Sequence, residues 1–134
     1  KHNAPYYAEI EKEYQRLDIA DYMTIHDPNQ KIEEEYRKAD MFCLPSLYEG
    51  YPNVVAEAMS CGLPILCSNV YENPYIVEEG VNGFLFNPKN VEEIVNAIKK
   101  MAELSPEERH EMGMRNRQLC LMRNTEESFL KSYV

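Results

Sequence analysis

The sequence predicts an α/β fold in which a parallel sheet carries helices on both of its faces. Short continuous apolar runs at 41–44 and 65–68 are typical of strands that are buried on both sides. Stretches with apolar residues at helical spacing lie between and after these runs, and the clearest covers 91–101. Strands that alternate with helices favour a parallel sheet, because each crossover helix returns the chain to the edge where the last strand began.

Composition limits the classes of function. The 134 residues are 44% hydrophobic, which suits one domain with its own core over residues 1–134. A net charge of −9 argues against nucleic acid and against an anionic membrane surface as partners. No apolar run is long enough for a transmembrane helix, and no signal-peptide pattern is present, so we expect a soluble chain. Cys43, Cys61 and Cys67 lie among apolar or small residues, so we expect buried thiols in a reducing compartment.

The first third of the chain is expected to hold two helices and two strands. Apolar positions at helical spacing predict a helix from Pro5 to about Asp18. Aromatic and β-branched residues predict a brief strand at Tyr22–His26. After a turn at 27–29, a short acidic helix places Tyr36 on its buried face, and the strand at 41–44 follows.

The last half is expected to contain two strands and several helices. The strand at 65–68 leads into a polar loop, a short helix at 75–79, a turn at Asn82-Gly83 and a last strand at 84–86. Asn90, with a glutamate three residues later, caps the helix at 91–101. Ser105 begins another helix in the same way, and Asn124 begins a final one.

The stretch from Pro45 to Gly62 joins a strand to a helix through a turn-forming loop. In an open parallel sheet such a corner lies at the carboxyl ends of the strands, where a helix N-terminus offers N–H groups and partial positive charge to a phosphate. Glu49 in the loop and Glu57 in the helix can accept hydrogen bonds from sugar hydroxyls. Taken alone, Glu49 could instead be a solvated loop residue, and Glu57 could merely complement the helix dipole.

The longer stretch PSLYEGYPNVVAEAMSCGLPILCSN resembles the signature of retaining, nucleotide-sugar-dependent glycosyltransferases of the GT-B fold. That signature has two glutamates separated by seven residues, which match Glu49 and Glu57. VNGFLFNPKNVEEIVNAI also resembles the segment that follows the signature. The resemblance implies a Rossmann-like, donor-binding carboxyl-terminal domain, of which residues 1–134 would be a truncated part. The first strands, with an Arg/Lys pair for the diphosphate, and the amino-terminal domain would lie outside this sequence.

The resemblance also implies roles for individual residues. Glu57 would bind the ribose hydroxyls of the donor, and Glu49 would lie near the transferred sugar as the catalytic residue. Main-chain groups of the loop and first helical turn would face the sugar or the diphosphate; these residues are Gly50, Tyr51, Pro52, Asn53, Val54 and Val55. One departure is that Tyr75 stands where the family often has a glutamate.

The expected partners are a nucleotide-sugar donor, a glycan or lipid-linked sugar as acceptor, and the missing amino-terminal domain. We expect no cofactor and no metal, because GT-B enzymes typically neutralise the leaving group with basic side chains and a helix dipole, and no Asp-X-Asp pair occurs here. We expect polysaccharide biosynthesis in the cytoplasm, with membrane association of the full-length protein left open. The isolated chain is expected to be inactive.

Two other classes of function stay open at this point. A sugar-nucleotide epimerase would need a different histidine and glutamate constellation, and a phosphorylase would need a lysine that holds pyridoxal phosphate. A non-catalytic module with the same fold would be free to lose the acidic pair, whereas this sequence keeps both Glu49 and Glu57.

Overall fold

The computed structural model describes residues 4–26, 31–47, 53–71 and 73–132. The chain divides into two compact units, Lys1–Gln30 and Lys31–Val134, and each is described by itself. The described elements are, in order, α1 (Ala4–Leu17), α2 (Ile32–Lys38), β1 (Phe42–Leu44), α3 (Asn53–Ser60), β2 (Ile65–Ser68), α4 (Asn73–Ile76), β3 (Gly83–Phe86), α5 (Val91–Glu103) and α6 (Pro106–Ser132).

The first unit consists of α1 and the segment that follows it. Helix α1 confirms the prediction and ends at Leu17, and the next residue, Asp18, has a positive φ of 51°. The Tyr14 hydroxyl donates to the main-chain carbonyl of Met23, so the segment after the turn folds back along the helix. The predicted strand at Tyr22–His26 is wrong: no described strand pairs with these residues, and Tyr22 is 91% exposed. Favourable residue types alone do not form a strand without a neighbour to bond to.

The second unit is built on a parallel sheet with the order β1-β2-β3. Phe42 of β1 is in register with Ile65 of β2, which in turn is in register with Gly83 of β3. All four residues of the central strand are buried, as the continuous apolar run predicts. The predicted parallel α/β architecture is therefore confirmed in this unit.

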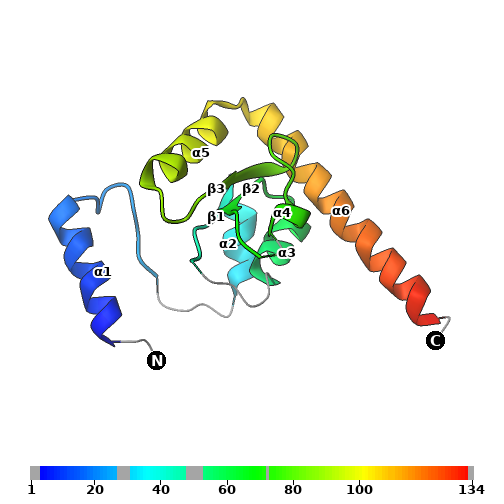
Figure 1. Cartoon of the computed structure of the whole chain (residues 1–134), viewed down its shortest axis with the longest axis horizontal. Helices are drawn as coiled ribbons and strands as arrows, with labels where there is room; N and C mark the ends of the chain where they lie inside the picture. Colours follow the sequence, from blue (N-terminus) through cyan, green and yellow to red (C-terminus); the bar gives the residue numbers. More distant parts are fainter. Residues whose placement is uncertain (1–3, 27–30, 48–52, 72, 133–134) are drawn as a thin grey trace. The chain divides into compact units, whose positions relative to one another are not determined.

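Helices cover both faces of this sheet (Figure 1). Alternate residues of β2 point to opposite faces, so Ile65 and Cys67 join one core cluster and Leu66 joins the other. The first cluster is completed by α2, α3 and the segment after α4, through Tyr36, Val55, Ala58, Met59, Leu63 and Val77. The second is completed by β3, α5 and α6, through Phe84, Phe86, Ala97, Met101 and Met112.

Helix ends follow the capping signals in part. The side chain of Asn90 accepts a hydrogen bond from the amide of Glu93 at the start of α5, as predicted. Ser105 and Glu108 bond to each other's amides at the start of α6, and these bonds lower the pKa of Glu108. The predicted start of a separate helix at Asn124 is wrong, because α6 continues without a break. No glycine or proline follows Gly113 to interrupt it.

Two shorter predictions need adjustment. The helix expected at 75–79 is instead α4, which begins at Asn73, where the side-chain amide donates to the carbonyl of Ser68 over 2.9 Å. Gly83, expected in a turn, is the first residue of β3. A Cβ at this position would overlap the carbonyl oxygen of Ile65, so the close approach of β2 and β3 requires glycine.

The cysteines are buried to different degrees. Cys67 is fully buried, as predicted, and Cys61 is partly exposed. The prediction of burial is wrong for Cys43, which is exposed because it lies on an edge strand and points away from the face on which Phe42 and Leu44 pack. The surrounding protein still shields its sulfur enough to raise the pKa of the Cys43 thiol.

Helix α6 approaches α3 through a contact between two glycine backbones. Gly62 ends the α3 turn with a φ of 79°, and a Cβ at the buried Gly113 would overlap the Gly62 carbonyl oxygen. Three residues later, the buried Asn116 side chain donates to the carbonyls of Leu63 over 2.8 Å and Asn82 over 2.9 Å. The packing of α6 therefore depends on the lack of a side chain at position 113.

We predict that Gly113→Ala lowers the free energy of unfolding by about 2 kcal/mol or more, because the added methyl group pushes α6 off the Gly62 turn. Denaturant unfolding measures the change. Met114→Ala is the matched control on the same helix: Met114 is 43% exposed, and the expected change is within about 0.5 kcal/mol. Equal stability of Gly113→Ala and the wild type would contradict the close approach.

A second prediction concerns thiol labelling of the native protein, followed by peptide mass spectrometry. Cys43 should label first, and its rate should keep rising with pH because its raised pKa keeps the thiolate fraction low near neutrality. Cys67 should label only after denaturation, since no part of it is exposed. Labelling of Cys67 as fast as that of Cys43 would contradict the assignment of β2 as the central strand.

Candidate functional site

The candidate site is the corner where β1 ends and α3 begins. The strand ends at Leu44, and α3 begins at Asn53, so its amino terminus follows the carboxyl end of the sheet's edge strand. Residues 48–52 lie outside the described residues, and with them Glu49, Gly50, Tyr51 and Pro52. The side chain of Asn53 is also outside the description, so the roles expected for these five residues stay predictions.

The carboxyl edge of the sheet is tied together by polar groups. The Ser68 hydroxyl at the end of β2 donates to the carbonyl of Leu44 over 3.4 Å. The main-chain amide of Asn69 donates to the carbonyl of Phe86 over 2.7 Å. Ser68 is fully buried, so its bond is shielded from water. These bonds link the carboxyl ends of all three described strands, so they hold the end of β1 in place relative to β2 and β3.

The first turn of α3 offers main-chain groups rather than side chains. Val55 is fully buried in the core, and Val54 is 39% exposed. The first amides of a helix have no intrahelical acceptor and carry partial positive charge. Val55 could therefore contact a ligand at this corner only through its main chain, which is the kind of contact that its expected role requires.

Glu57 lies one turn into α3, and its side chain is exposed. The hydroxyl of Tyr36 donates to Oε2 of Glu57 over 3.4 Å, which joins α2 to α3. Tyr36 itself is only 6% exposed, and burial, followed by the negative charge of Glu57, raises the pKa of its hydroxyl. Sequence reasoning placed Tyr36 in the core but missed this contact, because residues 21 apart on two different helices give no periodic signal.

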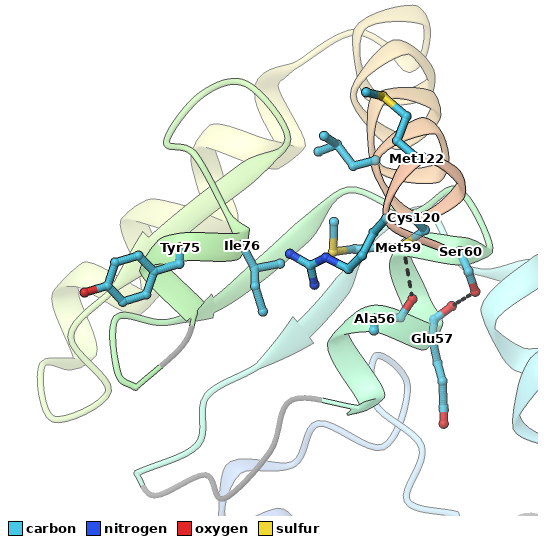
Figure 2. Close-up of a pocket in the computed structure, with 10 residues that line it drawn as sticks. Ala56, Glu57, Met59, Ser60, Tyr75, Ile76, Cys120 and Met122 are labelled. Carbon is cyan, nitrogen blue, oxygen red and sulfur yellow. Dashed lines mark hydrogen bonds between the residues drawn. The ribbon is translucent and has the colours of Figure 1, made fainter. Parts of the chain in front are cut away.

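A cavity of about 520 Å³ lies between α3, α4 and α6, and its lining on α3 begins at Ala56. Its walls are mixed: Met59, Ile76 and Met122 are apolar, whereas Ser60 and Arg123 are polar or charged. The exposed Tyr75 also lines it. Glu57 is one of the lining residues, and in Figure 2 its carboxylate points away from Cys120 and Met122. The Cys120 thiol donates to the Ala56 carbonyl over 3.7 Å.

Neither a metal cluster nor a membrane-spanning helix is found among the residues that the structure describes. No three His, Cys, Asp or Glu side chains gather there as a ligand set for a metal ion. None of the described helices is both long and apolar enough to cross a membrane.

Comparison with known proteins identifies the family. The family model described as glycosyl transferases group 1 matches residues 3–119. The chain belongs to this family. The match confirms the resemblance to glycosyltransferases that the signature around Glu49 and Glu57 indicates.

Several curated members of the family are similar in sequence. An uncharacterized glycosyltransferase from Haemophilus influenzae is 39% identical over 83 residues, which cover 61% of this chain and 24% of that protein. The UDP-Gal:alpha-D-GlcNAc-diphosphoundecaprenol alpha-1,3-galactosyltransferase of Escherichia coli is 36% identical over 67 residues, which cover 50% of this chain and 17% of that protein. The matched regions are thus a quarter or less of the length of these relatives.

Solved structures show the same fold. A protein from Anabaena, HepE, solved with UDP and glucose, aligns with a TM-score of 0.83 at 22% identity over 98% of this chain and 37% of its own. Sucrose-phosphate synthase from Thermosynechococcus elongatus aligns with a TM-score of 0.74 at 23% identity over 95% of this chain and 35% of its own. These likenesses confirm the predicted Rossmann-like α/β fold.

Proposed function

We propose that the full-length protein transfers a sugar from a nucleotide-sugar donor to an acceptor with retention, and that this chain supplies part of the donor site. The observation that carries the proposal is the position of Glu57. Its carboxylate is exposed one turn into the helix that follows the carboxyl end of β1, in a chain that belongs to a glycosyltransferase family. In open α/β sheets ligands bind at this edge.

The donor would be held by charge and by main-chain amides. Glu57 binds the ribose hydroxyls, because a carboxylate accepts stronger hydrogen bonds than a neutral group does. Glu49 lies near the transferred sugar as the catalytic residue. The segment Gly50–Val55 presents its main chain to the sugar or the diphosphate, where the partial positive charge at the start of α3 favours an anion.

The names of similar proteins support the substrate classes. The Escherichia coli relative is named for a UDP-linked sugar donor and a diphosphoundecaprenol-linked acceptor, and the Anabaena structure contains UDP and glucose. We extend only the chemical classes to this chain: a nucleotide-sugar donor, and a glycan or lipid-linked sugar as acceptor. The amino-terminal domain of the full-length protein would bind that acceptor.

The departing nucleoside diphosphate needs positive charge as the glycosidic bond breaks. We propose that basic side chains outside this sequence and the start of α3 supply it, without a metal. The basis is the resemblance to GT-B enzymes, together with the helix terminus at the site.

The first test of this function is Glu57→Gln in the full-length protein, titrated calorimetrically with UDP, GDP and ADP. Glutamine keeps the size of the side chain and removes its charge, so the affinity for the preferred nucleotide should fall by about 1.5–3 kcal/mol. Glu103→Gln makes the same change at an exposed position at the end of α5 and should leave binding unchanged. Unchanged binding in Glu57→Gln would remove Glu57 from the ribose role.

The second test removes metal ions from the full-length protein with EDTA. If the leaving group is neutralised by protein groups, affinity for the same nucleotide and the rate of donor turnover should stay within about twofold of the untreated protein, since no bridging cation is lost. The proposal of metal-independent transfer fails if activity disappears after EDTA and returns when Mg²⁺ or Mn²⁺ is added.

A further inference from the structure

We infer that Tyr36 is a positioning residue of the donor site: its hydroxyl holds the carboxylate of Glu57 in the orientation that binds the donor. The inference rests on the function proposed for Glu57 and adds a residue from a different helix. The hydroxyl and the carboxylate oxygen are 3.4 Å apart, and this bond links α2, whose Tyr36 belongs to the first core cluster, to α3.

The two partners differ in how firmly they are held. Tyr36 is 6% exposed and belongs to the core, whereas the side chain of Glu57 is exposed. The Tyr36 ring also contacts the Phe42 ring edge-on, with centroids 5.8 Å apart and an interplanar angle of 76°. Packing therefore fixes the position of the hydroxyl, and the hydroxyl can restrain a glutamate that would otherwise move freely in solvent.

Such a restraint favours binding. A glutamate with several rotatable bonds loses conformational entropy when a ligand immobilises it, and a partner that holds it beforehand reduces this cost. Only Oε2 of Glu57 accepts from Tyr36, so Oε1 keeps its acceptor sites for a hydroxyl group of the ligand. The bond is longer than a typical hydroxyl–carboxylate bond, which leaves room for it to shorten when the donor binds.

The hydroxyl of Tyr36 keeps its proton near neutral pH. Burial is the main reason that its pKa is raised, and the negative charge of Glu57 raises it further. Tyr36 therefore acts as a donor to Glu57 throughout the neutral range, which is the role that a positioning residue needs.

A purely structural role makes a different prediction. In that case Glu57 would only satisfy the buried hydroxyl of Tyr36, and the hydroxyl would matter for stability but not for the ligand. Tyr36→Phe separates the two cases, because it removes the hydroxyl and keeps the ring that packs on Phe42. A double-mutant cycle with Glu57→Gln then measures whether the two side chains act on the ligand together.

The experiment uses the full-length protein and titrations with UDP, GDP and ADP. Tyr36→Phe should weaken binding of the preferred nucleotide about three- to tenfold, as expected for the loss of one hydrogen bond. In the Glu57→Gln background the same substitution should change affinity by less than about twofold, because the group that it positions no longer carries charge. In turnover, Tyr36→Phe should raise the donor KM and leave kcat unchanged, since ribose contacts bind the ground state and transition state equally.

Tyr14→Phe is the matched control, because it also removes a tyrosine hydroxyl that donates a hydrogen bond, here to a main-chain carbonyl. It should leave nucleotide binding unchanged, and thermal unfolding of both variants should show that they fold. If Glu57→Gln weakens binding and Tyr36→Phe does not, or if the two effects simply add, the positioning role is overturned and the donor site stands. If Glu57→Gln has no effect, the proposed function of Glu57 fails, and the role of Tyr36 fails with it.

Discussion

The buried side chain of Asn116 holds together the amino-terminal edge of the sheet. Its amide nitrogen donates to two main-chain carbonyls: that of Leu63, two residues before β2 begins, and that of Asn82, immediately before β3 begins. Both bonds lie away from water, where a carbonyl without a partner is costly. Together with the contact between the backbones of Gly62 and Gly113, they fix α6 against the end of α3. The position of α3, and of Glu57 on it, therefore depends on Asn116, which lies 53 residues after Leu63 in the sequence.

The amino-terminal and carboxyl-terminal edges of the sheet differ in the groups that they present. At the amino-terminal edge, main-chain carbonyls accept hydrogen bonds from α6. Asn116 donates to Leu63, and the guanidinium of the neighbouring Arg115 donates to Val81 over 2.9 Å. At the carboxyl edge, Ser68 ties β2 to β1, and the first amides of α3 have no acceptor within their own helix. The first amides of α3, which can bind an anion, lie at the edge where the family signature lies, and the hydrogen bonds of Asn116 and Arg115 hold the opposite edge to α6.

The sequence was sufficient for features that depend on local pattern. The continuous apolar run of β2, the amphipathic stripe of α5 and the cap at Asn90 are each visible within a few residues, and each is confirmed. Features that depend on contacts between distant residues were not predictable in the same way. Tyr22–His26 has strand-like composition but no described partner, and Cys43 lies in an apolar run but on an edge strand. The bond between Tyr36 and Glu57 joins two helices, and no spacing within either helix reports it.

The orientation of the candidate donor site follows from this dependence on distant contacts. Helix α3 has eight residues, too few for a stable helix in isolation, so its geometry comes from packing. Val55 and Ala58 anchor its inner face in the core, Gly62 ends it against α6, and Tyr36 reaches the carboxylate of Glu57 from α2. The core and α6 therefore position the backbone of α3, whereas Tyr36 of α2 positions the carboxylate of Glu57. A signature glutamate is a precise ligand only because residues outside the signature hold both its helix and its side chain in place.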